Sequence, residues 1–266
     1  MNALVVFIAM TVQTIPQGLP AAACSRVAME WAAVAGADNR EKFDKEKQFM
    51  EQCVIYPRDR HSRLALKGFD PPAERTISLE LSQALLRENE YVLHPSIPYD
   101  GRRRLTEEDT EYYFQLITVV AGLKDRNAIK PLAGAITSGG VACEALANFG
   151  DEAFPEVAAA TKNWNSGSRA AAILTMRIML EQRTVSNAVR DQIKSLLRLM
   201  LTDKQPGVRM GAINAIAVLR DPAFVHVFKR IAKSDPFETS QVGRKRGVYP
   251  VRNAATSAIM SITGKR

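Results

Sequence analysis

Residue patterns that carry out common enzyme chemistry are scarce in this chain of 266 residues. It contains only three histidines, His61, His94 and His226, which are far apart and share no partner spacing, so we expect each to be structural. The sequence has no glycine-rich phosphate loop, no Gly-x-Ser-x-Gly and no His-Glu-x-x-His. These absences exclude the usual nucleotide-binding, serine-hydrolase and zinc-protease patterns, and we predict a protein that is not an enzyme and needs no cofactor.

Cysteine is equally scarce. The three cysteines, Cys24, Cys53 and Cys143, include no Cys-x-x-Cys pair, so no metal site is predicted. If the protein is exported, a disulfide between Cys24 and Cys53 would hold the N-terminal helices together, while Cys143 would be buried as a small apolar side chain. Three unpaired thiols are the alternative.

The apolar run near the N-terminus is short. Residues 3–12 cannot span a bilayer as a mature helix, and a polar break and three alanines at 21–23 follow them. This pattern is typical of a signal peptide over residues 1–23, although no Lys or Arg precedes Arg26. We therefore expect a bacterial periplasmic or secreted protein whose mature chain has no transmembrane segment. Lipid anchoring at Cys24 is one alternative, and an uncleaved, cytoplasmic chain is another.

The net charge of +8 is concentrated at one end of the chain. Residues 201–266 carry twelve Lys or Arg and four acidic residues, whereas residues 1–200 are balanced. A localised basic region attracts anions, although an ordinary solvated face is the alternative because aromatic residues are sparse there. The candidate partner or polyanion contacts are Lys229, Arg230, Lys233, Arg244, Lys245 and Arg246. The last three lie in residues 237–249, which have no helical period and form either a binding loop or a connection without a role.

The feature that the sequence does contain is a recurring helix–turn–helix pattern. In its clearest copy, Pro206 starts a helix, and Asp221 with Pro222 ends it and starts a second one. Apolar residues recur along the first helix at steps of three and four, at Val208, Ala212, Ala215, Ile216 and Leu219. A hairpin this short cannot bury both of its apolar faces alone, so the pattern requires similar neighbours.

Such neighbours occur on both sides. Tyr249–Ile259 repeats the Pro-x-Val-Arg start in compressed form, and 43 residues separate Arg209 from Arg252. Degenerate copies of the turn lie at Ala121–Ile129 and Ala147–Pro155, and a degenerate copy of the start lies at Ser166–Ile173. This combination resembles the HEAT-repeat family, in its HEAT-like form named after the phycobilisome lyases, over about residues 106–266.

The resemblance implies an all-α fold, a right-handed α–α superhelix (a HEAT-like solenoid) over residues 106–266. We expect residues 24–105 to form an atypical N-terminal helical cap and a connecting loop, with helices near 27–34, 43–54 and 76–91 and polar breaks at 56–61 and 69–72. In such repeats the arginine at the helix start usually reaches an aspartate in the turn between repeats. Arg209 and Arg252 are therefore expected to lock repeats together, with Asp203 and Asp221 as candidate partners.

The resemblance also implies a scaffold, because this family serves many unrelated functions. We expect a protein or peptide partner on a concave face lined by helices near 139–149, 166–181, 206–219 and 250–262. Nucleic-acid or other polyanion binding through residues 201–266 is the alternative. A HEAT-like lyase is a third reading, for which the sequence offers no convergent acid, base or thiol. The identity of the partner and the oligomeric state do not follow from the sequence.

Overall fold

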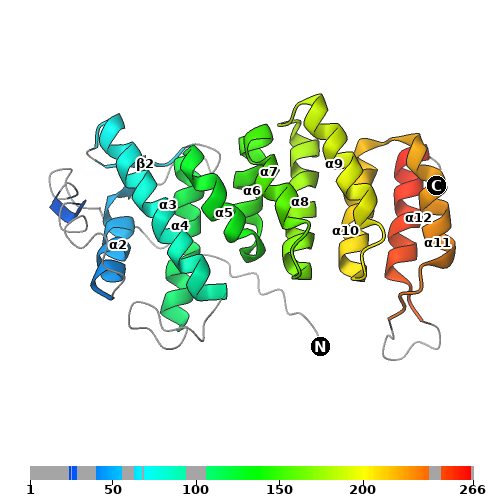
Figure 1. The fold of residues 1–266 in the computed structure, drawn as a ribbon, viewed down its shortest axis with the longest axis horizontal. Helices are drawn as coiled ribbons and strands as arrows, with labels where there is room; N and C mark the ends of the chain where they lie inside the picture. Colours follow the sequence, from blue (N-terminus) through cyan, green and yellow to red (C-terminus); the bar gives the residue numbers. More distant parts are fainter. Residues whose placement is uncertain are drawn as a thin grey trace.

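The structure is a computed structural model that describes residues 24, 26–28, 40–55, 63–67, 69–93, 106–239 and 247–264. These residues are almost entirely helical (Figure 1), which confirms the all-α prediction. The α-helices are α2 (Arg40–Cys53), α3 (Pro71–Leu93), α4 (Glu107–Leu123), α5 (Ile129–Gly134), α6 (Gly140–Phe149), α7 (Phe154–Ala160), α8 (Ser166–Gln182), α9 (Asn187–Met200), α10 (Pro206–Leu219), α11 (Val225–Ser234) and α12 (Pro250–Thr263). No helix of this described part is long and apolar enough to cross a membrane.

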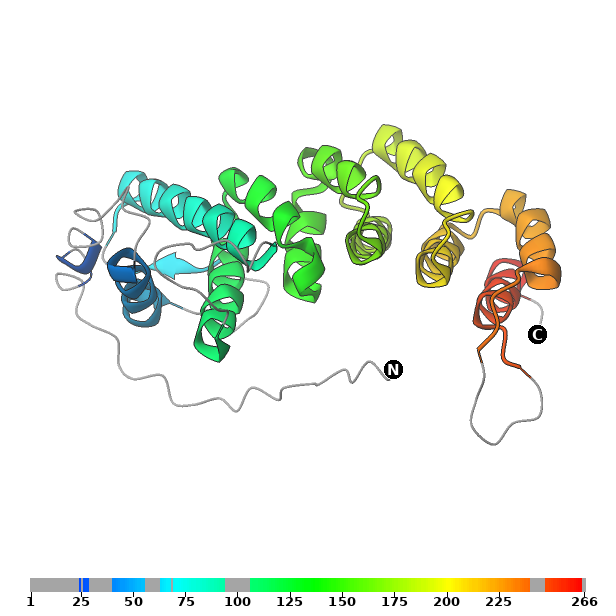
Figure 2. The ribbon, with the colours of Figure 1, turned by 60° about the horizontal axis from the view of Figure 1, so that its bottom comes forward.

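From α3 onward the helices lie side by side in an elongated row of two layers (Figures 1 and 2). Helices α4, α6, α8, α10 and α12 form one layer, in which each helix packs against the next. Helices α3, α5, α7, α9 and α11 form the other layer, in which contact is sparsest between α9 and α11. Figure 2 shows that the row bows, with the α4–α12 layer on the inner side of the bend and the α3–α11 layer on the outer side.

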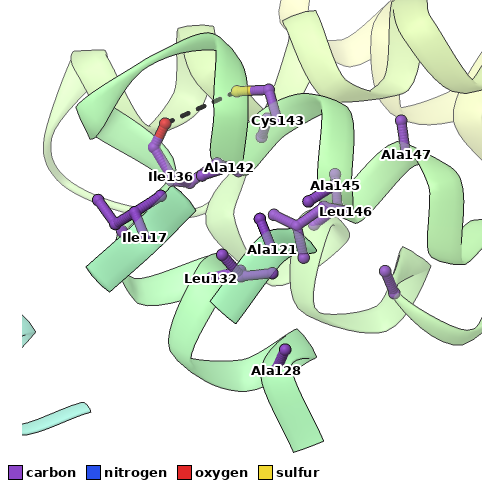
Figure 3. Close-up of a cluster of buried hydrophobic side chains, with 14 of the residues drawn as sticks. Ile117, Ala121, Ala128, Leu132, Ile136, Ala142, Cys143, Ala145, Leu146 and Ala147 are labelled. Carbon is purple, nitrogen blue, oxygen red and sulfur yellow. Dashed lines mark hydrogen bonds between the residues drawn. The ribbon is translucent and has the colours of Figure 1, made fainter. Parts of the chain in front are cut away.

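A continuous hydrophobic core lies between the two layers. Leu116 of α4, Leu146 of α6, Met176 of α8 and Ile213 of α10 are all fully buried and belong to the same cluster. Figure 3 shows the part of this core where Ile117 and Ala121 of α4 meet Leu132 of α5 and Leu146 of α6. Alanines at many of the buried positions let the helices approach closely. Burial of each larger side chain stabilises the fold by roughly 1.5–3 kcal/mol, so the shared core holds the row together.

Cys143 lies within this core, as predicted. Its thiol is free and buried, and Sγ donates to the backbone oxygens of Ile136, at 3.7 Å, and of Ala171, at 3.8 Å (Figure 3). Burial raises the pKa of the Cys143 thiol, so it stays protonated and behaves as a small apolar side chain.

Helix starts follow the capping rules used on the sequence. The sequence predicts that Thr106, followed by the acidic residues 107–109, caps the next helix. In the structure Thr106 accepts a hydrogen bond from the Asp109 N–H, at 3.1 Å, and Asp109 accepts one from the Thr106 N–H, at 2.9 Å, so this cap of α4 is confirmed as a capping box. The expected break at residues 69–72 is shorter than predicted, because only Phe69 and Asp70 lie outside helices. Asp70 accepts from the Ala73 N–H, at 2.9 Å, and Pro71 begins α3, because proline at the first helical position loses no hydrogen bond.

Two segments for which the apolar stripe in the sequence predicts one helix each are divided in the structure. The segment expected as a helix over 126–137 consists of a 3₁₀ turn η1 (Arg126–Ala128), α5 and a second turn η2 (Ile136–Ser138). The segment expected over 152–163 consists of η3 (Gly150–Glu152) and α7. Asp125 caps η1 by accepting from the Asn127 N–H, at 2.9 Å. The apolar period alone does not reveal such divisions, because tight 3₁₀ turns place side chains on nearly the same faces.

The N-terminal part contains a short antiparallel pair that the sequence did not predict. Strand β1 (Val54–Ile55) pairs with β2 (Ala65–Leu66), with Val54 opposite Leu66 and both side chains buried. Val54 therefore leaves the helix expected over 43–54 and begins a strand. The Leu64 N–H donates to the Gly122 oxygen, at 2.8 Å, which ties this pair to the end of α4. A two-residue strand is too short to produce an alternating pattern in sequence.

Several expectations fall outside the described residues. They include the signal peptide at 1–23, most of the helix near 27–34, the break at 56–61, and His61 and His94. Arg244, Lys245 and Arg246 also lie outside. On either side of them, Thr239 and Val248 form an isolated antiparallel bridge, with N–H to oxygen distances of 2.8 and 3.0 Å.

Candidate functional site

Two arginine–aspartate pairs join three successive interhelical turns along one edge of the row. Arg169, near the start of α8, donates from Nε and Nη2 to the two carboxylate oxygens of Asp203, at 2.7 and 2.9 Å. Its Nη1 donates to the backbone oxygens of Asn163 and Trp164, at 2.9 and 3.0 Å. One side chain therefore binds both the turn that precedes its own helix and the next turn along the row.

Arg209 repeats this arrangement one hairpin further on. It donates to both carboxylate oxygens of Asp235, at 2.8 and 2.9 Å, and to the backbone oxygens of Asp203 and Lys204, at 2.8 and 3.2 Å. We call Arg169, Asp203, Arg209 and Asp235 the arginine ladder. Bidentate pairing of this kind fixes both distance and orientation, so the ladder sets how successive hairpins stack.

Arg252 occupies the corresponding place at the start of α12. Its Nε donates to the backbone oxygen of Asp235, at 2.6 Å, and its guanidinium lies over the Tyr249 ring, 4.0 Å from the ring centroid. It thus contacts the turn before its own helix, as Arg169 and Arg209 do.

The ladder keeps its carboxylates ionised. The hydrogen bonds from Arg169 hold the pKa of Asp203 below its ordinary value, and Asp203 in turn raises the pKa of Arg169. Burial alone would raise the pKa of Asp235. The hydrogen bonds from Arg209 and from the Phe237 N–H outweigh burial, so the pKa of Asp235 also lies below its ordinary value. At neutral pH both aspartates are therefore ionised, and each carboxylate is paired with an arginine.

The observed pairing differs from the one expected from sequence. Asp203 and Arg209 both belong to the ladder, but Asp203 pairs with Arg169 and Arg209 pairs with Asp235. Asp221 lies outside the ladder, where it accepts from Lys194 and from the Ala223 N–H and so caps the 3₁₀ turn η4 (Pro222–Phe224). The signal that was overlooked is the match between Arg169 and Arg209, each three residues into its helix, which Ser168 obscured by standing in place of valine.

A groove of about 660 Å³ opens on the outer layer beside the ladder. The C-terminal half of α9 and the following turn form one wall, and α11 forms the other. Its lining includes Arg198, Leu201 and Lys204 on the first side and His226, Val227, Arg230 and Ile231 on the second, with Asp203, Arg209 and Asp235 of the ladder between them. We call this the α9–α11 groove.

The α9–α11 groove carries unbalanced positive charge. Its two carboxylates, Asp203 and Asp235, are already held by Arg169 and Arg209. Within the described part of the chain, the side chains of Arg198 and Arg230 have no hydrogen-bond or ion-pair partner, and the charge of Lys204 helps to lower the pKa of Asp203. Of these three, only Arg230 was a candidate from the sequence. Lys229 and Lys233 are exposed on the same helix but do not line the groove.

A second groove lies between α7 and α9 and has a volume of about 570 Å³. Its lining is more apolar, with Phe154, Pro155, Ala158 and Leu196 beside Lys162 and Asp191. The two grooves share α9, which also carries the exposed side chain of Leu199. Trp164, in the turn between α7 and α8, is 89% exposed, and its backbone is held by Arg169 at the same edge as the ladder.

The inner layer also carries exposed large apolar side chains among the described residues. They include Phe114 of α4, Val141 of α6 and Met260 of α12. Small or polar residues such as Asn214 of α10 and Ser257 of α12 are exposed on the helices between and beside them. This is the face on which the sequence led us to expect the partner.

A buried polar cluster fastens α2 to α3 and α4. Tyr112 donates to Glu46, at 2.7 Å, and Arg87 donates to the other carboxylate oxygen of Glu46. Burial, together with the charge of Glu46, raises the pKa of Tyr112 well above its ordinary value, so this hydroxyl remains a donor. Nearby, Cys24 and Cys53 form a disulfide with a Cα–Cα distance of 5.6 Å, at the C-terminal end of α2. Among the described residues, no three His, Cys, Asp or Glu side chains converge on a point where a metal ion would sit.

Comparison with known proteins leaves the family open. No family model matches the chain, and no curated protein matches it. Among solved structures, a crystal structure of an engineered protein from the Northeast Structural Genomics Consortium is similar over 90% of this chain and 97% of that one, with 13% identity and a TM-score of 0.41. The HEAT-repeat resemblance therefore stays a prediction that rests on the residues themselves.

Proposed function

We propose that this protein is a non-enzymatic scaffold, a right-handed HEAT-like superhelix that binds a partner protein along its outer layer. The observation that carries the proposal is the arginine ladder, which binds three turns to one another beside two open grooves. A surface held in place before binding loses little conformational entropy when a partner docks. The ladder thus supports a role in presenting a preformed surface.

The grooves favour the outer layer over the inner layer that we expected from sequence. Hollows accept side chains, and exposed aromatic residues beside them are the usual energetic anchors of protein interfaces. The α7–α9 groove, the α9–α11 groove and Trp164 lie along the same part of the row, between α7 and α11.

Export remains part of the proposal. The Cys24–Cys53 disulfide supports an oxidising compartment, because such bonds persist mainly outside the cytosol. Cell fractionation of the chain expressed with its native N-terminus, followed by mass measurement of that terminus, tests this point. A mass consistent with cleavage after residue 23 and recovery outside the cytoplasm are expected. An intact Met1 in the cytosolic fraction would contradict export and would strengthen the nucleic-acid alternative.

Polyanion binding is the second candidate function. The observation that favours it is the set of exposed cations Arg198, Lys204 and Arg230 at the groove, joined on α11 by exposed Lys229 and Lys233. Affinity for nucleic acid through such contacts should fall steeply as salt increases. Absence of binding to duplex or single-stranded DNA at low salt would remove this candidate.

Peptide display against the folded chain, followed by hydrogen-exchange mapping, tests the scaffold function. Selected peptides are expected to slow exchange in α9 and in α7 or α11, and to leave α4 and α6 unchanged. Peptides that protect only the inner layer would move the site to the concave face. Failure to enrich any peptide, with binding to nucleic acid instead, would overturn the proposal.

Trp164 provides a mutational test of the same surface. Replacing it with alanine is expected to weaken binding of a selected peptide by about tenfold or more, as for an interface anchor. The free energy of unfolding should change by less than about 0.5 kcal/mol, because the side chain is 89% exposed. Phe114→Ala, which removes a half-exposed aromatic side chain from α4, is the matched control and should leave affinity unchanged. Equal losses for both variants would contradict an anchor role for Trp164.

A further inference from the structure

We infer that the α9–α11 groove is a binding site for an acidic peptide segment of the partner protein, an inference that rests on the proposed scaffold function. Three properties of the groove support this: its excess of cations, the shape and apolar character of its lining, and the lack of aromatic residues in that lining.

The charge of the groove depends on which residues the ladder pairs with one another. Every carboxylate that lines the groove is held by a bidentate arginine, Asp203 by Arg169 and Asp235 by Arg209. The remaining cations of the lining, Arg198, Lys204 and Arg230, are exposed and outnumber its two carboxylates, each of which already pairs with an arginine. A ligand that brings carboxylates therefore gains charge-assisted hydrogen bonds with these cations.

Apolar side chains line the groove together with these cations. Leu201 and Val227 are buried within the lining, and Ile231 is partly exposed beside them. A volume of about 660 Å³ is in the range of sites that accept several side chains. Apolar surface flanked by cations fits a segment that alternates apolar side chains with Asp or Glu. The sparse contact between α9 and α11 leaves this space unfilled by the protein's own side chains.

The lining distinguishes a peptide from nucleic acid. None of the residues that line the α9–α11 groove is Phe, Tyr or Trp, so bases would find no stacking surface inside it. The three cations line a single groove, whereas strong duplex binding uses phosphate contacts spread along a helix. A short acidic segment is small enough to contact all three cations within the groove.

The test measures fluorescence anisotropy at low ionic strength with a fluorescein-labelled peptide that alternates Glu with Leu and Ala. The same peptide with Gln in place of Glu, and a labelled oligothymidine, are the comparison probes. The double variant Arg198→Glu with Arg230→Glu is expected to bind the acidic peptide about tenfold more weakly, or worse, than the unmodified protein. The variant Arg75→Glu with Lys130→Glu makes the same change in net charge on exposed residues that line neither groove, and it should bind as the unmodified protein does. Circular dichroism verifies that both variants remain folded.

Each other outcome overturns the inference in a recognisable way. Equal losses in the two double variants would mean that only net charge matters. A separate variant, Lys162→Glu, that weakens binding more than the Arg198 and Arg230 variant would place the peptide between α7 and α9. Equal binding of the Gln peptide would remove the role of charge, and tighter binding of oligothymidine with the same variant sensitivity would assign the groove to nucleic acid. The scaffold function fails separately, when displayed peptides protect no helix of the outer layer.

Discussion

Replacing Arg169 with alanine is expected to lower the free energy of unfolding by about 3–5 kcal/mol. The substitution leaves the Asp203 carboxylate, whose side chain is only 9% exposed, without its bidentate partner. It also removes the donor that holds the backbone oxygens of Asn163 and Trp164. A buried charge that loses its partner costs more than the pair contributed, which is why the effect should be large. Urea denaturation of the two proteins, followed by circular dichroism, measures the difference.

A second arginine on the same helix, outside the ladder, shows how much of this loss of stability follows from removing an arginine in general. Arg177 pairs with Glu181 one turn further along α8, and the two side chains are 39% and 46% exposed. Arg177→Ala is expected to change the free energy of unfolding by less than about 0.5 kcal/mol, because exposed pairs of this spacing contribute little. Similar losses for the two variants would show that the ladder does not stabilise the stacking of the hairpins.

The same pair predicts a dependence on pH. Because the folded-state pKa of Asp203 lies below the ordinary value of 3.8, the pair contributes its full stability above that value. The contribution is lost as the pH falls from about that value through the lower folded-state pKa. The stability difference between the unmodified protein and Arg169→Ala should therefore be constant near neutral pH and shrink in acid. A difference that stays constant in acid while both proteins remain folded would contradict this assignment of the Asp203 pKa.

Replacing both Cys24 and Cys53 with serine is expected to lower the free energy of unfolding by about 2–4 kcal/mol. The disulfide closes a loop with a sequence separation of 29, and removing it gives the unfolded chain more freedom. The sulfurs also lie in the core formed by α2 and its neighbours, where serine hydroxyls would be less favourable. Urea denaturation with and without dithiothreitol measures the effect.

Dithiothreitol supplies the matched control for this prediction. The unmodified protein should lose stability when the reductant is added, whereas the double serine variant should show no further change. Cys143 is present in both proteins and is already a free thiol, so it contributes equally. A protein whose unfolding is indifferent to the reductant would contradict a stabilising disulfide.

The sequence by itself determined the elements of the fold. The apolar stripe of α10 predicted which residues face the core, and Val208, Ala212, Ala215 and Ile216 are buried, while Leu219 is only partly so. The cap at Thr106 and the start of α10 at Pro206 were also legible, because each depends on residues within one helical turn. Short-range rules of this kind apply before the chain is packed.

The tertiary structure alone decided how these elements are joined and where the surface is hollow. Arg209 was predicted as a locking residue, but its partner Asp235 lies 26 residues away and depends on how one hairpin stacks on the next. The groove beside it lies where α9 and α11 make little contact on the outer side of the bend, and Trp164 is exposed in the turn between α7 and α8. Helical period and capping are set by neighbours along the chain, whereas pairing across turns and the space between layers depend on packing angles that no local pattern records.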